Sequence, residues 1–330
     1  MSALYQVTPK KQGSFDVFEL RDDRQDVSCL ICPAAGNFIF SLLKGGQEFI
    51  FCQSLEAYAA ERPLSGIPFL APWANRISGN AYSFQDKTYA LDPSLGNLRL
   101  DPHGQASHGL LLKTSLWELE QAVAGESGAQ LVTRLDFSKV EGGLEQFPFD
   151  HRYRTIFRLE RGALTVQTSV TNTGTGDMPV AFGYHPYFSL RGAGRAQWAV
   201  TIPAGHLRKL NVNFVPTGEL EARETLARGE WVNVGDTVLD HAFTDLSRDS
   251  QGYCRFALRG PGRSLDVDFG PAYSESILFS PAGKEFLCIE PMTAPTDAFN
   301  LRARGLYPEL KVIGPGQSLQ ADFRMTPLLP

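Results

Sequence analysis

Short runs in which apolar and polar residues alternate, bounded by Gly, Asp or Pro, cover most of the chain and predict β-strands. The clearest run, HRYRTIFRLERGALTVQTSVTNTG (151–174), predicts two long strands joined at Arg161-Gly162. In the second of these strands, alternate positions form one face: Leu164, Val166, Thr168 and Val170. Helical periodicity is thin, and its best segment is the short LEAYAAER (55–62).

The same reading predicts further strands within ten other stretches: 15–23, 37–43, 47–52, 81–91, 116–124, 129–138, 196–205, 253–269, 276–281 and 285–291. The last stretch, LKVIGPGQSLQADFRM (310–325), predicts a closing hairpin that turns at Gly314-Pro315-Gly316. Gly and Pro are spread as turn residues and no linker or internal repeat is visible. The pattern predicts an all-β fold, one large antiparallel β-sandwich with little helix, as a single domain over residues 1–330.

Composition narrows the function classes. The chain of 330 residues has 43% hydrophobic residues and 22 Phe, enough for a substantial core. Its net charge is −5 and its basic residues are scattered, which argues against a nucleic-acid partner. No apolar run reaches the length of about 18 residues that a membrane helix needs. The start, MSALYQVTPKKQG, lacks the apolar core of a signal peptide, so we expect a cytoplasmic protein.

Five cysteines do not suggest a disulfide framework. Cys29 and Cys32 form a C-x-x-C, but they lie in the apolar, strand-like SCLICP. Residues three apart on a strand face opposite ways, and no second C-x-x-C accompanies them. We therefore expect buried thiols rather than a zinc or redox site.

Polar residues occur within or beside apolar stretches at five places. They are Asn75 and Arg76 in GIPFLAPWANRISG, His108 in ASHGLL, His185 in AFGYHPYFSL, Asp240 and His241 in TVLDHAF, and Glu290 in EFLCIEPMTAPTDAFN. Each has an ordinary structural explanation, such as a turn cap, a loop tie or a hydrogen-bonded core residue. Glu290 is the hardest to explain in this way, because a carboxylate after an apolar strand is costly to bury unless it is paired or its shifted pKa is used.

Together the motifs at these places resemble those of the aldose 1-epimerase (galactose mutarotase-like) family. The motifs occur in the family's order, from a Gly-Ile-Pro segment leading to Asn75-Arg76-Ile77, through Ser107-His108-Gly109 and GYHPYF, to Leu239-Asp240-x-x-Phe243 and CIEPMTAPTDAFN. They span roughly residues 66–300. The resemblance implies a β-supersandwich that interconverts the α and β anomers of an aldose.

The resemblance also implies the roles of the residues. Glu290 is the base that takes the proton of the anomeric hydroxyl, and His185 is the acid that protonates the ring oxygen. Both oxygens lie on one carbon, so the acid and the base must flank it. Pro186 favours an extended backbone at His185, which would help to aim its imidazole. A histidine that titrates near neutrality suits this task.

The remaining candidates would bind the sugar: Arg76, His108, Asp240 and Asn75. Trp73, Tyr184 and Phe299 are candidates for packing against the sugar, although each could equally belong to the core. No metal or other cofactor is expected, since proton transfer alone does the work. The expected partner is a small sugar, and the sequence leaves the oligomeric state open.

Several alternatives remain open. His185 follows Gly183-Tyr184 and precedes a proline, and Pro-Met-Thr follows Glu290; both differ from galactose-specific members, so the substrate could be another aldose or a hexose phosphate. The sequence places no set of additional arginines for a phosphate. A non-catalytic carbohydrate-binding or sensing module is a second class. A glycosidase using Asp240 and Glu290, and a metal site of His108, His185 and Glu290, are weaker alternatives. Asp240 rather than His241 is expected in the cleft.

Overall fold

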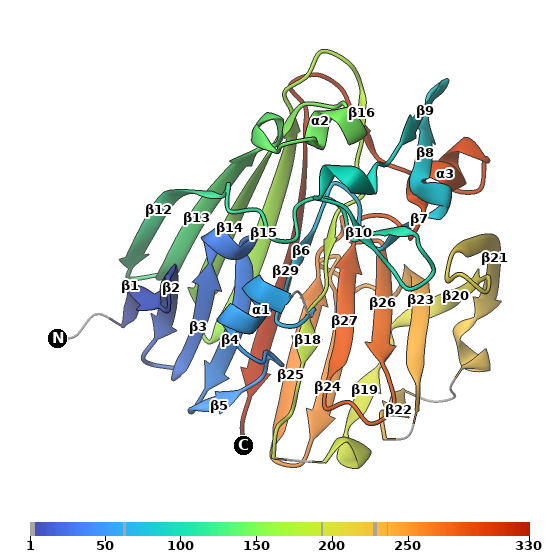
Figure 1. Ribbon diagram of the computed structural model, residues 1–330. Helices are drawn as coiled ribbons and strands as arrows, with labels where there is room; N and C mark the ends of the chain where they lie inside the picture. The colour runs from blue at the N-terminus through green and yellow to red at the C-terminus, as the bar shows by residue number, and fades with distance from the viewer. Residues whose placement is uncertain (1–3, 62–63, 193, 227–229, 236) are drawn as a thin grey trace.

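The computed structural model describes residues 4–61, 64–192, 194–226, 230–235 and 237–330 (Figure 1). Its body is two layers of antiparallel sheet that share one hydrophobic core. This architecture confirms the predicted β-sandwich with little helix. Among the described residues, no helix is long and apolar enough to span a bilayer.

One layer is a nine-stranded sheet. In spatial order its strands are β12 (Glu118–Gly125), β13 (Gly128–Asp136), β14 (His151–Glu160), β15 (Ala163–Asn172), β29 (Ser318–Leu328), β25 (Arg263–Phe269), β24 (Cys254–Gly260), β19 (Ala199–Thr201) and β22 (Trp231–Asn233). Alternate residues of β15 are buried, as the sequence predicted, and the chain turns from β14 into β15 at Arg161-Gly162.

The second layer consists of two sheets. The eight-stranded sheet contains, in order, β21 (Pro216–Ala222), β20 (Ala204–Leu210), β23 (Leu239–Leu246), β26 (Glu275–Ser280), β27 (Leu287–Met292), β17 (Gly183–Tyr184) and β6 (Phe69–Leu70), with β18 (Tyr187–Phe188) also paired to β27. The five-stranded sheet contains β1 (Tyr5–Gln12), β2 (Phe15–Asp22), β3 (Val27–Cys32), β4 (Phe38–Lys44) and β5 (Gln47–Glu48). An isolated bridge between Ile50 and Phe188 connects the two sheets.

Short elements lie at the upper end of the sandwich in Figure 1, and α1 (Leu55–Glu61) packs on the five-stranded sheet. The small sheets are β10 (Arg99–Leu100), β11 (Ala106–Ser107) and β7 (Arg76–Ile77); β8 (Ala81–Phe84) and β9 (Lys87–Ala90); and β16 (Met178–Pro179) with β28 (Val312–Ile313). The helices are α1 (Leu55–Glu61), α2 (Gly143–Gln146) and α3 (Ala298–Ala303). The helix predicted within 55–62 is thus present at Leu55–Glu61, and Arg62 lies outside the described residues.

The predicted closing hairpin is wrong. The chain does turn between β28 and β29, but these strands do not pair with each other. β28 pairs with β16, and β29 inserts between β15 and β25 in the middle of the nine-stranded sheet. β29 thus has neighbours on both sides, and its alternate side chains are buried in the core.

The core joins residues from both layers. Tyr184 of the eight-stranded sheet packs against Phe323 of β29, with ring centroids 5.0 Å apart. The five cysteines are free, and burial raises the pKa of Cys29 to about 12 and that of Cys32 to about 11. The C-x-x-C is therefore a pair of inert, buried thiols, as expected.

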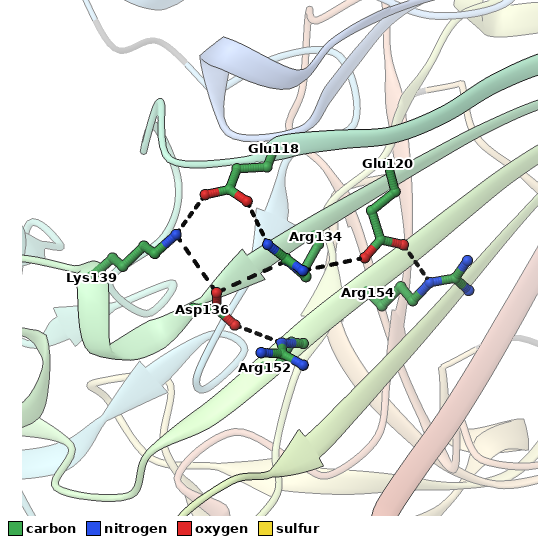
Figure 2. A network of polar contacts seen from close by, with 7 residues as sticks. All are labelled: Glu118, Glu120, Arg134, Asp136, Lys139, Arg152 and Arg154. Carbon is green, nitrogen blue, oxygen red and sulfur yellow. Dashed lines mark hydrogen bonds and ion pairs between the residues drawn. The ribbon is translucent and has the colours of Figure 1, made fainter.

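An ion-pair network covers the outer face of β12, β13 and β14 (Figure 2). Its members are Glu118, Glu120, Arg134, Asp136, Lys139, Arg152 and Arg154. Exposed pairs of this kind contribute about 0–1 kcal/mol each, because water and salt screen them. The network lies on the nine-stranded sheet, and none of its residues is a candidate catalytic or binding residue.

Candidate active site

Glu290 lies on β27, on the face turned away from the main core. Its neighbours Leu287 and Ile289 belong to the main core, whereas Met292 packs with Ile277 of β26 and Ala242 of β23 in a separate apolar cluster. Successive residues of a strand point to opposite faces, so Glu290 shares the face of this second cluster. Ile277 is its direct partner across the strands.

Loops close over this outer face, and Glu290 is only 1% exposed. The covering segments include Leu70 and Ala74, which pack in the same apolar cluster, and the chain at Gly109, which bridges to Ala71. In Figure 1 the small sheet of β7, β10 and β11 lies above the ends of β26 and β27. A carboxylate on the outer face of a sheet is thereby placed in a dry environment.

His185 lies between β17 and β18, directly beside Glu290. Its Nε2 is 3.2 Å from Oε1 of Glu290. Its backbone N–H donates to the carbonyl of Pro68 at 3.1 Å, and its ring stacks on Tyr187 with centroids 4.7 Å apart and planes inclined by 5°. The backbone hydrogen bond and the stacking partner both hold the imidazole in one orientation.

Burial shifts both members of this pair toward their uncharged forms. It raises the pKa of Glu290 well above its ordinary value, and the negative charge of Asp240 adds to this effect. Burial, aided by the positive charge of Arg99, lowers the pKa of His185 to about 3. The expectation that His185 by itself titrates near neutrality is therefore wrong. Desolvation therefore favours the form of the pair with a neutral imidazole and a carboxylic acid.

His108 lies next to His185, held by an unusual backbone. The two rings meet edge to face with centroids 5.3 Å apart. His108 and Gly109 both have a positive φ, 67° and 72°. A Cβ atom at Gly109 would lie 2.0 Å from the carbonyl oxygen of Ala71, so only glycine fits there. Positive φ at a non-glycine residue costs energy and is typical of functional sites.

Asn75 and His108 are joined through the backbone. The N–H of His108 donates to the carbonyl of Asn75 at 2.7 Å, and Asn75 also has a positive φ of 58°. The side chain of Asn75 is buried, and its Oδ1 accepts a hydrogen bond from Nη1 of Arg76 at 3.1 Å. The structure thus brings three of the predicted binding residues, Asn75, Arg76 and His108, into one connected group.

Arg76 has a carboxylate partner that the sequence did not identify. Its Nε donates to Oδ2 of Asp101 at 2.6 Å, and its guanidinium lies 5.2 Å from the ring centre of Phe214. The other oxygen of Asp101 accepts backbone N–H groups from His103 and Gln105. In the sequence, Asp101 resembles an ordinary turn residue before Pro and Gly. Only the pairing of β7 with β11 brings its turn beside Arg76.

Asp240, rather than His241, lies on the face of Glu290. β23 is extended, and Ala242, which belongs to the same face as Asp240, is paired through Ile277 to Glu290. The negative charge of Asp240 contributes to the raised pKa of Glu290, and Asp240 itself has a raised pKa because it is partly buried. His241 points to the opposite side of the strand.

Three buried polar atoms at this place have no hydrogen-bond partner among the described residues. They are Nδ1 of His108, Nδ1 of His185 and Oε2 of Glu290. A buried polar atom without a partner costs about 1–3 kcal/mol, so native proteins rarely leave several together. Their concentration between β27, His185 and the loop of His108 indicates a site that a polar ligand completes.

Comparison with known proteins gives the family. The family model described as aldose 1-epimerase matches residues 29–326. The chain belongs to the aldose 1-epimerase family. It is accordingly an isomerase, and its substrate is a sugar.

Individual relatives are distant but cover most of the chain. The uncharacterised Escherichia coli (strain K12) protein YphB is 26% identical over 270 residues, which cover 78% of this chain and 81% of YphB. A galactose mutarotase-like protein from Clostridium acetobutylicum is 20% identical with a TM-score of 0.86, over 99% of both chains. Galactose 1-epimerase from Lactobacillus acidophilus NCFM is 14% identical with a TM-score of 0.78, over 99% of both chains. The last two similarities show a common fold.

The aromatic residues considered for sugar packing are core residues. Trp73, Tyr184 and Phe299 are each 1% exposed. Phe279 of β26 is a better candidate that the sequence analysis missed, because it is partly exposed and its ring centre is 6.3 Å from that of His185. A hydrophobic strand residue gives no sign in the sequence that its face is the one turned to the ligand.

The candidate site does not have the form of a metal centre. Within the part of the chain that the structure describes, no three His, Cys, Asp or Glu side chains gather closely enough to hold a metal ion. What the arrangement offers is a proton donor and a proton acceptor in contact, with a cation and an amide nearby. These groups suit acid–base chemistry on a polyhydroxylated ligand.

Proposed function

We propose that this protein is an aldose 1-epimerase in which Glu290 and His185 open and close the sugar ring. The observation that carries the proposal is the contact of 3.2 Å between Nε2 of His185 and Oε1 of Glu290 in a buried place with unpaired polar atoms. The two oxygens that must exchange protons are bonded to the same carbon of the sugar. An acid and a base in contact with each other are therefore close enough to reach both.

In the opening step, the Glu290 carboxylate takes the proton from the hydroxyl on C1. The electron pair of that O–H bond forms the C1 carbonyl, the bond from C1 to the ring oxygen breaks, and protonated His185 gives its proton to the ring oxygen. The step leaves a carboxylic acid and a neutral imidazole, which are the two forms that burial favours. After the carbonyl rotates, closure reverses both transfers on the other face of C1.

The pair carries one proton throughout this cycle. Transfer of this proton between Nε2 of His185 and Oε1 of Glu290 interconverts two forms of the pair. The ionic form, imidazolium with carboxylate, opens the ring, and the neutral form, imidazole with carboxylic acid, closes it. No proton therefore has to come from water. The positive charge of Arg76 works against the raised pKa of Glu290 and thus favours the carboxylate needed for opening. His108, whose ring meets that of His185, would hydrogen-bond to the ring-oxygen side of the sugar.

The remaining residues are assigned to binding. Arg76 and Asn75 would donate hydrogen bonds to sugar hydroxyls, and Asp240 would accept one from the far side of the cleft. Asp101 is a positioning residue, since it holds Nε of Arg76 and so directs the other edge of the guanidinium. No cofactor takes part in these steps.

Polarimetry tests the proposal directly. Freshly dissolved α-D-glucose and α-D-galactose are followed with wild type, Glu290→Gln and His185→Asn. Wild type is expected to speed equilibration of at least one sugar, and each variant is expected to lose this effect while keeping its thermal unfolding transition. The matched controls are Glu285→Gln and His206→Asn; Glu285 is exposed to solvent and His206 forms a surface pair with Asp245.

The results separate the alternatives. If the wild type accelerates no aldose, in polarimetry or in exchange NMR with a wider set of sugars, a binding or sensing role is favoured. If the variants remain as active as wild type, the assignment of the catalytic pair is wrong even though the family is correct.

A further inference from the structure

The segment that follows the catalytic strand β27 is fastened directly to the strand of Arg76. The link is Asp297, a buried residue whose backbone N–H donates to the carbonyl of Arg76 at 3.0 Å. Its carboxylate accepts two hydrogen bonds from Ser78. Oδ1 accepts from the backbone N–H at 3.0 Å, and Oδ2 accepts from the hydroxyl at 2.8 Å. One residue therefore holds the end of β7 by its main chain and by its side chain.

The backbone of Asp297 has a conformation that permits this double contact. Its φ is 61°, in the left-handed region that Asp and Asn tolerate better than most other residues. Burial raises the pKa of its carboxyl group, and the hydrogen bonds from Ser78 oppose that shift. The guanidinium of Arg304 lies 3.4 Å from Oδ2 on the solvent side. The carboxylate can be buried because these donors surround it.

The support behind Asp297 is a helix that is anchored in the core. Asp297 directly precedes α3, and Nδ2 of Asn300 in that helix donates to Oδ1 of Asp297 at 2.8 Å and to the carbonyl of Ala81 at 3.0 Å. Phe299 of the same helix is buried against Tyr82 of β8, with ring centres 5.1 Å apart. Asp297 therefore holds β7 from a packed position rather than from a free loop.

The same segment is also tied to the chain that leads to His185. Thr293, which lies between Glu290 and Asp297, donates from its backbone N–H and from its hydroxyl to the carbonyl of Phe182, both at 2.9 Å. Phe182 lies shortly before His185 in the sequence. The short stretch from Glu290 to Asp297 thus has fixed contacts with the segments of both His185 and Arg76.

We propose that Asp297 is a positioning residue that fixes Arg76 relative to Glu290 and His185. The inference rests on the proposed function, in which Arg76 binds hydroxyl groups of the sugar. Asp101 holds the guanidinium of Arg76 at Nε, whereas Asp297 holds the backbone from which that side chain extends. A displacement of about 1 Å in a binding group can reduce the rate by up to about 10²-fold. Asp297 acts on the sugar site without touching the sugar.

The test compares variants on both sides of this contact. Asp297→Asn keeps the shape of the side chain and the tolerance for a positive φ, whereas Asp297→Gly keeps the backbone and removes the carboxylate. Ser78→Ala removes one donor from the opposite side. The control is Asp22→Asn, because Asp22 is a buried residue of β2 whose carboxylate also accepts backbone N–H groups. Exchange NMR gives kcat and KM with the aldose that wild type turns over, and each variant's Tm is measured.

Asp297→Gly is expected to lower kcat/KM by roughly 10-fold to 100-fold. Most of the loss should appear in KM, because Arg76 is assigned to binding rather than to proton transfer. Asp297→Asn and Ser78→Ala should show smaller losses in the same direction. In an Arg76→Ala background, each change should alter kcat/KM by less than about twofold, since no guanidinium is left to position. Asp22→Asn should lower Tm and leave KM unchanged.

A second readout does not depend on turnover. The NMR signal of the Nε–H of Arg76, identified by its loss in Arg76→Ala, should shift in Asp297→Asn and stay in place in Asp22→Asn. The same signal decides the inference if Asp297→Gly does not fold or if Arg76→Ala is too slow to measure.

Three results overturn the inference. The first is an unchanged KM in a folded Asp297→Gly protein. The second is an equal fractional loss of kcat/KM in the wild-type and Arg76→Ala backgrounds, because Asp297 would then act only on the fold. The third is an Arg76 signal that does not move in Asp297→Asn. If wild type turns over no aldose, the proposed function fails by itself, and the Arg76 signal alone decides whether Asp297 positions this side chain.

Discussion

Replacement of Glu290 by Gln separates the catalytic role of this side chain from its cost to the fold. The change keeps the size of the side chain in a place that is 1% exposed, but it removes the ionisable group. A general base contributes about 10²–10⁴ to the rate, which corresponds to roughly 3–5 kcal/mol of the barrier. We therefore expect Glu290→Gln to lose at least about 99% of the enzymatic rate.

Although Glu290→Gln is expected to lower the rate, it is expected to raise the stability of the folded protein relative to wild type as the pH rises. The pKa of Glu290 in the folded protein is well above its usual value, whereas an unfolded Glu has a pKa of about 4.3. Between these two values the folded protein holds a proton on Glu290 that the unfolded chain has released, so this group by itself lowers the stability of wild type by about 1.4 kcal/mol for each pH unit in this window. Glu290→Gln escapes this loss, and its stability relative to wild type should rise with pH.

The assay combines anomer exchange NMR with urea unfolding at several pH values between 4.5 and 8, using the aldose that wild type turns over. Glu285→Gln, an exposed Glu on the same chain segment, is the control and should change neither the rate nor the pH dependence of stability. A Glu290→Gln enzyme with more than a tenth of the wild-type rate would refute the assigned role. A stability difference that is flat with pH would refute the buried, high-pKa carboxyl group.

Three further outcomes are expected. Asp101→Asn should raise KM roughly tenfold with less effect on kcat, because Arg76 loses a charge-assisted partner worth about 1.5–3 kcal/mol; an unchanged KM in steady-state kinetics would contradict this. Gly109→Ala should unfold at a markedly lower temperature, since its Cβ would meet the carbonyl oxygen of Ala71 at 2.0 Å; an unaltered Tm would contradict the backbone described here. Burial lowers the pKa of His151 to about 4, so wild type should lose up to about 3 kcal/mol as the pH falls from 6.5 toward 4, and His151→Phe should lessen this loss in urea unfolding; identical pH dependence in both proteins would count against it.

Much of the strand content was predictable because it depends on local pattern. Alternation with a period of two marks β14 and β15, and Arg161-Gly162 marks the turn between them, since both residues adopt a positive φ there. The helix at 55–61 was likewise visible. The final hairpin was not predictable, because strand partners are chosen by packing across the whole sheet and β29 fits between β15 and β25.

For the candidate site, the sequence predicted which residues could be functional, and the fold determined which of their side chains lie in contact. His185 and Glu290 stood out as ionisable groups in apolar runs, and the fold brings their side chains into contact. Asp101 did not stand out, because it resembles an ordinary turn residue. Its place beside Arg76 follows from the pairing of β7 and β11.

The sequence alone determined that this chain forms many short antiparallel strands and that its family motifs occur in order. Both features depend on residues that are close together in the sequence. The tertiary structure alone decided which face of β27 is covered, and therefore that Glu290 and His185 favour their uncharged forms. The physical reason is that a pKa depends on how far a group is removed from water and which charges surround it. Both of these are set by residues that are distant in the chain and adjacent only in the fold.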